Sequence, residues 1–433
     1  MVAWIGETFV SNTGWDHLEN LVDIGNRMAG SKGEQEAAEL ARNQLQEYTE
    51  ETSLITFDIQ GWQRGSSQIT TDNSTQSCIA LPRSPSTTAT AELIDLDYGL
   101  PDDFEETDVA GKIVMVDSFV PDWFDRYIHR REKYYHAVEN DAAGFIYKNH
   151  VEGCLPPTGS VGTADQPIGE IPAVGVSKET GARLSRRFED QEITVDVDAT
   201  ITDMKSQNVH AELGPETDEE IFITSHIDAH DIGEGAMDNG AGTAMVVELA
   251  RALQSRSEEL ETKIHFIAFG AEEVGLVGSS FDADTREFDS IKAILNFDGV
   301  VRGRTLSFTT HDFDQLERVA EDVADDFGHP VETSPTMGPH SDHWPYVQSG
   351  VPGYHVMSKT GDQGRGWGHT EADTLDKVEK RNFREQAILL SELAIRLADD
   401  EFHIEHKHPE AIAEKLEEED LAEGMKIIGD WPY

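Results

Sequence analysis

The sequence predicts an α/β protein with a mixed, mostly parallel central sheet flanked by helices, into which a smaller β-rich module is inserted. Two observations support this prediction. Between residues 208 and 397, apolar runs of strand length alternate with segments of helical periodicity, which is typical of a parallel sheet covered on both faces. Between residues 78 and 201, short strands alternate instead with loops and with one helix near residues 131–141.

The N-terminal segment opens the α/β part of the chain. Ser31 and Glu34 form a capping box, and apolar residues at helical spacing follow it. The stretch "SLITFDI" at 53–59 then predicts a strand. The predicted domains are the N-terminal segment of the α/β domain at 1–65, the inserted domain at 66–204, the main α/β segment at 205–400 and an acidic, amphipathic C-terminal extension at 401–433.

The remaining elements follow from the same patterns. In the inserted segment, strands are predicted at 91–99, 111–119, 143–149 and 171–177. In the main segment, strands are predicted at 220–228, 263–270, 291–299, 305–310 and 351–358. Helices of that segment are predicted at 240–254, 312–327 and 379–400.

The charge of the chain excludes some partners. Its 84 acidic residues against 34 basic ones give a formal net charge of -50, which would repel nucleic acids and anionic membranes. Such a surface suits very high salt, because at about 1 M the Debye length is only about 3 Å and self-repulsion is screened. We therefore expect a partner that is neither nucleic acid nor membrane, in a cell whose cytosol is rich in salt.

Two further features concern the compartment. The sequence has only two cysteines, Cys78 and Cys154, which excludes a cysteine-rich zinc module. We expect free thiols, with one bridge as the alternative. The N-terminus has no basic start followed by an apolar run of signal-peptide length, and no stretch approaches the length of a membrane span. The expectation from sequence is a cytoplasmic protein.

Three predicted strands end in residues that can bind a metal. The first ends at His226 and Asp228, the second at Glu272 and Glu273, and the third at Asp298. In open α/β sheets, ligands bind outside the carboxyl ends of the strands, so we expect these side chains to converge in one crevice.

Two loops add donors to this crevice. Asp238 lies in the glycine-rich turn "GEGAMDNGAG" before a helix, and His369 lies in the glycine-flanked loop "GWGHT". Imidazoles and carboxylates suit zinc or a similar divalent ion, and a carboxylate left over beside the metal can act as a general base. Taken alone, each residue also has a structural interpretation as a strand-end, turn or first-turn helix residue. Their matching positions at the strand ends favour the metal site.

Five ordered motifs resemble the M28 family of dinuclear zinc peptidases, which includes aminopeptidases and glutamate carboxypeptidase-like enzymes. They are "HIDAHD…GAMDNGAG", "FGAEEVGLVGS", "NFDGV", "SDHWPYVQSGVPG" and "GHTEADTLDKV". The segment "NRMAGSKGEQEAAE" shares this similarity, and "AVENDAAGFIYKN" with "IPAVGVS" resembles a protease-associated (PA) domain. The resemblance implies the zinc-peptidase fold, which is phosphorylase/hydrolase-like, with an inserted PA domain.

The resemblance also implies a ligand set. Asp238 would bridge two Zn²⁺ ions, and the peptide bond after it would be cis. His226 and Asp298 would complete one ion, and Glu273 and His369 the other. Another divalent transition metal, such as Co²⁺ or Mn²⁺ at one site, is the alternative.

Two neighbouring carboxylates would have different roles. Asp228 would orient the imidazole of His226 from the second coordination shell, and Glu272 would be the catalytic general base. One difference concerns the oxyanion donor, because many M28 enzymes have a tyrosine immediately before the last histidine ligand, where this chain has Gly368. Candidates for the donor or the substrate pocket are His340, His343, Tyr346 and Tyr354.

The predicted function is a zinc-dependent exopeptidase that hydrolyses peptide bonds with a water bridged between two metal ions. An aminopeptidase is the first choice, because acidic groups beside the metals suit a free α-ammonium. A carboxypeptidase or dipeptidase is the alternative, with Arg365 as the group for a terminal carboxylate and Arg302 as a weaker candidate. Further alternatives are a non-catalytic binding protein and a single-zinc acyl-transfer enzyme on the same scaffold. The sequence leaves the oligomeric state open, with a homodimer as one option.

Overall fold

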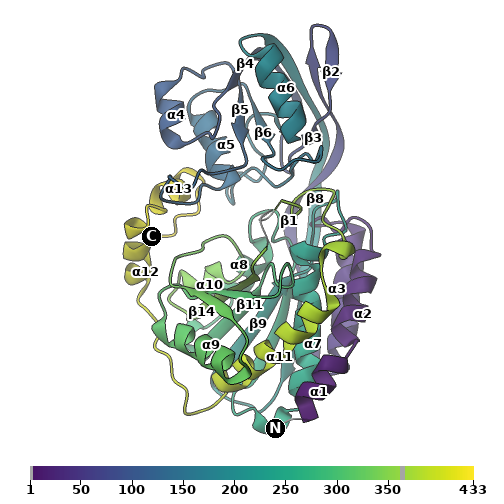
Figure 1. Cartoon of the computed structure of the whole chain (residues 1–433), viewed down its shortest axis with the longest axis vertical. Helices are drawn as coiled ribbons and strands as arrows, with labels where there is room; N and C mark the ends of the chain where they lie inside the picture. Colours follow the sequence, from purple (N-terminus) through teal and green to yellow (C-terminus); the bar gives the residue numbers. More distant parts are fainter. Residues whose placement is uncertain (1–2, 361–365) are drawn as a thin grey trace.

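The protein folds into two lobes joined by long strands (Figure 1). The computed structural model describes residues 3–360 and 366–433. The larger lobe contains the N-terminal segment and the main α/β segment, and the smaller lobe contains the inserted segment. The described strands belong to one fourteen-stranded sheet that passes through both lobes.

The order of the strands explains the two lobes. In the larger lobe the order is β13 (Val331–Ser334), β12 (Leu306–Thr309), β14 (Gly353–Ser358), β11 (Ile291–Phe297), β9 (Glu220–His226), β10 (Lys263–Phe269) and β8 (Glu192–Leu213). The path continues into the smaller lobe through β4 (Thr87–Asp95), β5 (Ile113–Asp117), β6 (Gly144–Lys148), β7 (Ala173–Val176) and β3 (Ile79–Ala80). β1 (Glu51–Thr71) pairs with β8 and with β2 (Ser74–Gln76). The predicted mixed, mostly parallel sheet is confirmed.

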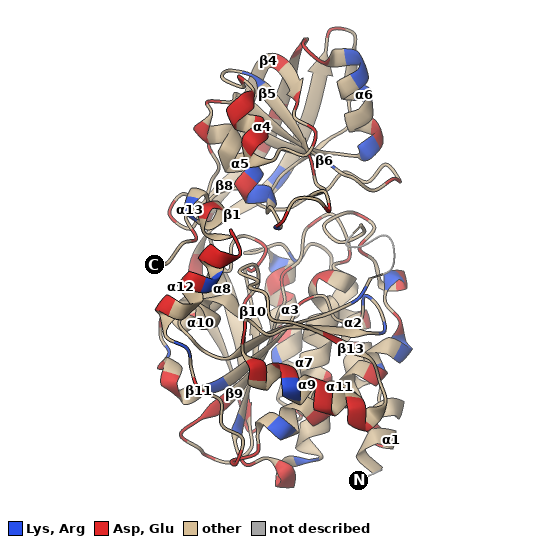
Figure 2. Cartoon of the chain, turned by 60° about the vertical axis from the view of Figure 1, so that its left-hand side comes forward, with Lys and Arg blue, Asp and Glu red and all other residues tan. Residues whose placement is uncertain are grey.

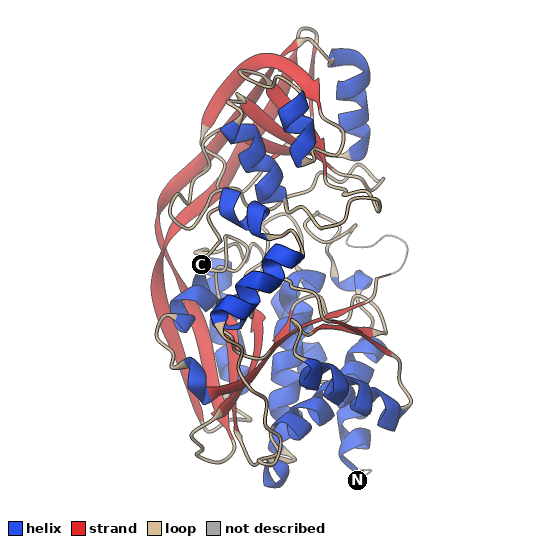
Figure 3. Cartoon of the chain, turned by 90° about the vertical axis from the view of Figure 1, so that its left-hand side faces the viewer, coloured by secondary structure: helices blue, strands red, loops and turns tan. Residues whose placement is uncertain are grey.

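Two long antiparallel strands connect the lobes. β1 and β8 pair from Glu51↔Glu212 to Thr70↔Thr194, with a bulge between Arg64 and Ser67, and Figure 3 shows them running the length of the molecule. The predicted domain boundaries at 65/66 and 204/205 fall inside these strands. The sequence predicted only a short strand at 53–59 and none at 192–213, because much of this ribbon is exposed on both faces and has a weak apolar pattern.

The centre of the larger lobe is a buried parallel sheet. β9 pairs in parallel with β10 and β11, and β11 pairs in parallel with β14. Successive strand residues face opposite sides, and two apolar clusters result, one containing Phe266 and Leu295 and the other Phe222 and Ile267. Because the four strands are parallel, their carboxyl ends lie at one edge of the sheet.

Helices cover both faces of this sheet. One face is covered by α2 (Thr13–Val22), α3 (Lys32–Leu45), α7 (Ala241–Gln254), α9 (Asp314–Phe327) and α11 (Lys380–Leu397), with α1 (Ala3–Val10) beside α11. The other face is covered by α8 (Val277–Ala283) and α10 (Trp344–Val347). Ser31 caps α3 as predicted, by accepting a hydrogen bond from the Glu34 amide.

The smaller lobe has its own core. Its helices are α4 (Pro101–Glu106), α5 (Arg130–Glu139) and α6 (Lys178–Phe188). Apolar clusters form on both faces of its sheet, one around Leu184 beneath α6 and the other around Tyr134 beneath α5. The predicted helix at 131–141 is thus α5, whereas α6 was not predicted.

The C-terminal segment connects the two lobes a second time. α12 (Pro409–Glu418) buries Ile412 and Leu416 against the larger lobe. α13 (Ala422–Ile427) packs on α5, and Ile428 joins the core of the smaller lobe. The sequence predicted an amphipathic extension here, without a role.

Charge is spread over the whole molecule. Acidic residues occur on both lobes (Figure 2). Among the described helices, none is both long and apolar enough to cross a membrane. Cys78 is buried, Cys154 is exposed, and both are free.

Candidate metal centre

The predicted donors of three strand ends meet in the structure. The Nε2 atom of His226, at the end of β9, lies 3.8 Å from Oδ1 of Asp298 and 3.9 Å from Oε2 of Glu272. It lies 3.4 Å from Oδ1 of Asp238. The parallel register of β9, β10 and β11 produces this convergence, because it places their last residues side by side.

A second group forms around His369. Its Nε2 atom lies 3.2 Å from Oδ2 of Asp238 and 3.4 Å from Oε2 of Glu273. Asp238 therefore faces both groups, with one oxygen toward each. The five predicted ligands lie together, at the edge where the predicted crevice was expected. The peptide bond between Asp238 and Asn239 is cis, as the resemblance implies.

Buried carboxylates hold the backbone of the site. Oδ1 of Asp228 accepts a hydrogen bond from the Glu272 amide at 3.0 Å, and Oδ2 accepts one from the Glu273 amide at 3.1 Å. Asp228 also lies beside His226, whose Nδ1 atom is 3.1 Å from the Asp228 carbonyl oxygen and 3.5 Å from Oδ1. One carboxylate thus fixes the two glutamates that follow β10, in addition to its contact with the imidazole.

Asp373 does the same for the loop that carries Asp238. Its two oxygens accept the amides of Met237 at 2.7 Å and Asp238 at 3.1 Å. The sequence analysis missed this residue. Its signal was its place in the motif "GHTEADTLDKV", four residues after His369.

The burial of so many carboxylates changes their acidity. Burial raises the pKa of Glu272 well above its usual range, and it raises the pKa of Glu273 to about 7. Burial alone would lower the pKa of His226, but the surrounding carboxylates, Glu272 foremost, raise it well above its usual value. Negative groups are therefore crowded away from water, which is the electrostatic condition for binding cations.

The donor atoms fit a divalent metal. Two groups have their nitrogen and oxygen atoms within 4.8 Å of one another, His226 with Glu272 and Asp298, and His230 with Glu273 and His369. Nε2 of His226 and Oε1 of Glu273 are buried and have no hydrogen-bond partner among the residues that the structure describes. Imidazole and carboxylate donors suit zinc.

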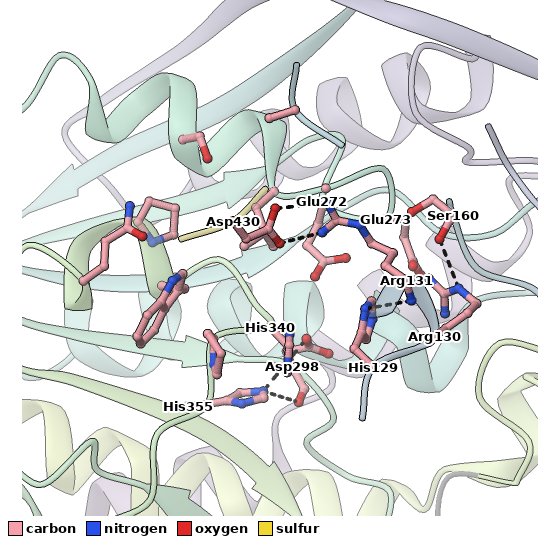
Figure 4. Close-up of a pocket in the computed structure, with 18 of the residues that line it drawn as sticks. His129, Arg130, Arg131, Ser160, Glu272, Glu273, Asp298, His340, His355 and Asp430 are labelled. Carbon is pink, nitrogen blue, oxygen red and sulfur yellow. Dashed lines mark hydrogen bonds and ion pairs between the residues drawn. The ribbon is translucent and has the colours of Figure 1, made fainter. Parts of the chain in front are cut away.

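The centre opens into a cavity of about 350 Å³ between the lobes (Figure 4). Both lobes and the C-terminal segment form its walls. Residues that line the cavity include Glu272, Asp298, Arg302, His340, His355, Arg130, Arg131 and Asp430. The two nitrogens Nη1 and Nη2 of Arg131 donate to Asp430 at 2.6 and 3.0 Å, so the smaller lobe and the C-terminal segment are joined at the wall of the cavity.

The predicted pocket residues divide into two groups. His340 lines the cavity, where its ring stacks on that of His129 at 4.9 Å. His343, Tyr346 and Tyr354 do not line it, and their assignment to the pocket is wrong. Arg365 lies outside the described residues.

The three misassigned residues are buried with partners elsewhere. The Tyr346 hydroxyl donates to Asp282 at 2.6 Å, and the Tyr354 hydroxyl donates to the Leu316 carbonyl at 2.5 Å. His343 lies against His311, with 3.0 Å between their Nε2 atoms. These side chains fill the core beside the site, because the strand and helix that carry them direct them away from the cavity.

Three residues near the centre were missed or undervalued. His355, on β14, has its Nε2 atom 3.3 Å from the Asp298 carbonyl and 3.9 Å from Oδ2 (Figure 4). His230 has its Nε2 atom 2.9 Å from Oε2 of Glu273. Nη2 of Arg302 lies 3.3 Å from Oδ2 of Asp238 and 3.9 Å from Oδ1 of Asp298. A histidine inside a buried strand was the available signal for His355.

Comparison with known families identifies two domains in the chain. Residues 208–394 match the model of peptidase family M28, and residues 84–184 match that of the PA domain. The main segment is an M28 peptidase domain. The predicted M28-type metallopeptidase, a hydrolase of the exopeptidase class with an inserted PA domain, is confirmed.

Individual relatives support the same assignment. The aminopeptidase YwaD of Bacillus subtilis is 27% identical over 387 residues, which cover 85% of this chain and 80% of the relative. A leucine aminopeptidase 2 of Trichophyton rubrum is 29% identical over 322 residues, 67% of this chain and 62% of the relative.

Solved structures show the same fold. A peptidase M28 precursor from Shewanella amazonensis has a TM-score of 0.76 at 22% identity and covers 93% of this chain and 96% of its own. A zinc aminopeptidase from Bacillus subtilis has a TM-score of 0.70 at 24% identity and covers 89% of this chain and 94% of its own.

Proposed function

We propose that this M28 peptidase is a zinc-dependent aminopeptidase with two metal ions, one held by His226, Asp238 and Asp298 and the other by Asp238, Glu273 and His369. The single observation that carries the proposal is Asp238, which places one carboxylate oxygen toward each group of donors. Each group alone would describe a mononuclear site. A carboxylate shared between the two groups suits a pair of ions about 3.5–4 Å apart.

The chain also supplies a proton carrier. When bound, the two ions would lower the pKa of water and polarise the scissile carbonyl. Glu272 precedes the ligand Glu273, lines the cavity and keeps its carboxylate 3.9 Å from Nε2 of His226. Because Asp228 holds the amides of both glutamates, they keep separate directions. Glu272 accepts a proton from the attacking water and passes it to the leaving amine.

A histidine replaces the missing tyrosine as the oxyanion donor. Gly368 has no side chain to offer, and the hydroxyls of Tyr346 and Tyr354 are engaged in the core. His355 lies beside Asp298 at the wall of the cavity. Its imidazole can donate a hydrogen bond to the negative oxygen that develops on the carbonyl, which is the task of an oxyanion donor.

The choice of an aminopeptidase over a carboxypeptidase rests on the charge of the cavity. The carboxylates beside the proposed metal ions, Glu272 among them, suit the α-ammonium group of a peptide. The relatives named as aminopeptidases support the same choice. The carboxypeptidase or dipeptidase alternative has one specific observation in its favour, because Arg130 of the smaller lobe also lines the cavity. Arg302 is committed to Asp238 and Asp298, which disfavours it as a carboxylate site.

One assay separates these functions. The purified protein is incubated with aminoacyl-anilides and with N-blocked dipeptides, each with and without a chelator. The aminopeptidase proposal expects hydrolysis of the anilides only, abolished by the chelator and restored by zinc. Hydrolysis of blocked dipeptides alone would favour the carboxypeptidase, and no hydrolysis of either would favour a binding protein.

We also propose that the protein is adapted to high salt. With a formal charge of -50, the acidic residues would repel one another in dilute buffer, and they occur on both lobes (Figure 2). The denaturation midpoint should therefore rise as KCl increases from 0.1 to 3 M, in the manner of screened repulsion. A midpoint that does not change with salt would contradict this adaptation.

A further inference from the structure

His230 is a buried histidine beside the second group of donors. It lies in the loop after β9, four residues beyond His226, and its side chain is only 5% exposed. Its Nε2 atom is 2.9 Å from Oε2 of Glu273, and its ring meets that of His369 edge to face at 4.5 Å. The contact with Glu273 lacks the geometry of a hydrogen bond, and neither ring nitrogen has a hydrogen-bond partner among the described residues.

A small cavity lies against this histidine. Its volume is about 10 Å³, about that of one water molecule or one metal ion. Its lining includes His230, Asp238, Glu273 and His369. Three buried donor side chains and the half-buried His369 therefore surround a space of the size of an ion. Asp238, Glu273 and His369 are the ligands proposed above for the second ion.

We propose that His230 is an additional metal ligand, so that the second ion is bound by His230, Asp238, Glu273 and His369. This inference rests on the proposed two-metal function. A buried imidazole without a partner is costly unless a donor or a cation satisfies it. Two imidazoles and two carboxylates make a complete tetrahedral set for zinc.

The proposal makes the two ions unequal. His226, Asp238 and Asp298 would give the first ion three protein ligands, whereas the second ion would have four. Catalytic zinc typically has three protein ligands and structural zinc four. We therefore expect the ion at His230 to bind more tightly and to leave last when the protein is treated with a chelator.

Zinc binding by His230→Gln tests the proposal without any enzyme assay. Both affinities are measured by titration against a competing chelator, and coordination is read from the absorption spectrum of the Co²⁺-loaded protein. We expect one of the two affinities to fall at least tenfold, because loss of even an outer-shell partner costs about 10–100-fold, and the Co²⁺ spectrum to change. His210→Gln is the matched control, since His210 is also buried but lies away from the cavity. Unchanged affinities and an unchanged spectrum would overturn the proposal.

A measurement on the wild-type protein covers the case in which the variant does not fold. X-ray absorption at the zinc edge counts the imidazoles bound. We expect three imidazoles per two zinc ions, from His226, His230 and His369. Two imidazoles per two ions would overturn this inference alone, and a protein that binds fewer than two ions would overturn the two-metal function as well.

Discussion

Three groups of side chains in the described part of the chain have the spacing of a metal site, and they lie in two different environments. Two groups, at the carboxyl ends of β9, β10 and β11, consist of buried and half-buried side chains. The third, formed by Glu261, Asp399 and Asp400, is exposed near the amino end of β10. Spacing does not distinguish the groups. Burial does, since it concentrates charge that water cannot screen.

Two Glu-Glu dipeptides of the chain show the same difference between an exposed and a buried environment. Glu258 and Glu259 are exposed, and Glu259 forms an ion pair with Arg256 at 2.8 Å, whose hydrogen bond lowers the pKa of Glu259. Burial instead raises the pKa of both Glu272 and Glu273. The position of a residue on the sheet, and not its type, determines whether it is a surface charge or a candidate for catalysis. Matched substitutions inside and outside the cavity can test this contrast.

The largest effect is expected from Glu272→Gln. Loss of a general base costs about 10²–10⁴-fold, so kcat on an aminoacyl-anilide should fall by that factor while zinc content is retained. Elemental analysis and steady-state kinetics check both quantities. Glu258→Gln is the control and should leave kcat unchanged. An equal loss in both variants would remove the distinction between the two pairs.

Metal content should distinguish the buried groups from the exposed one. We expect His369→Ala to lose one of two zinc ions after dialysis, because His369 contacts both Asp238 and Glu273. The triple variant Glu261→Gln/Asp399→Asn/Asp400→Asn should keep both ions. Elemental analysis gives the count, and loss of zinc from the triple variant would mean that spacing alone makes a site.

Buried histidines outside the cavity should make the stability of the protein depend on pH. Burial lowers the pKa of His17, His210 and His311 to about 3, so each is neutral when folded and binds a proton near pH 6.5 when unfolded. Stability is therefore complete above pH 6.5 and is lost as the pH falls toward 3. At pH 5.5 each of these histidines should lower the free energy of unfolding by about 1.4 kcal/mol relative to its value at high pH.

Urea unfolding at pH 7.5 and pH 5.5 measures this loss. Between these two pH values, the free energy of unfolding of His210→Gln should fall by about 1.4 kcal/mol less than that of the wild type. The exposed His403→Gln should not change it. An equal effect of the two substitutions would show that burial is not the cause.

An effect on stability of similar size is expected at the junction of the C-terminal segment with the smaller lobe. A Cβ at Gly424, in α13, would lie 2.3 Å from Oε2 of Glu132, a buried side chain held by Arg126. Gly424→Ala should therefore lower the free energy of unfolding by about 1–3 kcal/mol. Gly6→Ala, in α1 with no atom within 4 Å, should be neutral or stabilising, because alanine favours a helix. Thermal unfolding compares the two, and equal midpoints would mean that the junction is loosely packed.

The parts of the fold that local patterns specify were predictable. β9, β10, β11 and β14 are short buried runs, and α7 and α11 have clear helical periodicity. The ribbon of β1 and β8 was not predictable to its full length, because its exposed faces carry little apolar signal. The C-terminal segment gave a periodic pattern, but nothing local shows that α12 packs on one lobe and α13 on the other.

The sequence by itself determined which strand ends carry metal donors, because the order of strands and the parallel alternation are local properties of the chain. It could not determine which side chains face the cavity. Tyr346 and Tyr354 point into the core and His230 and His355 into the site, since these directions depend on packing between segments far apart in the sequence. Only the tertiary structure brought Arg131 and Asp430 together at the wall of the cavity, 299 residues apart.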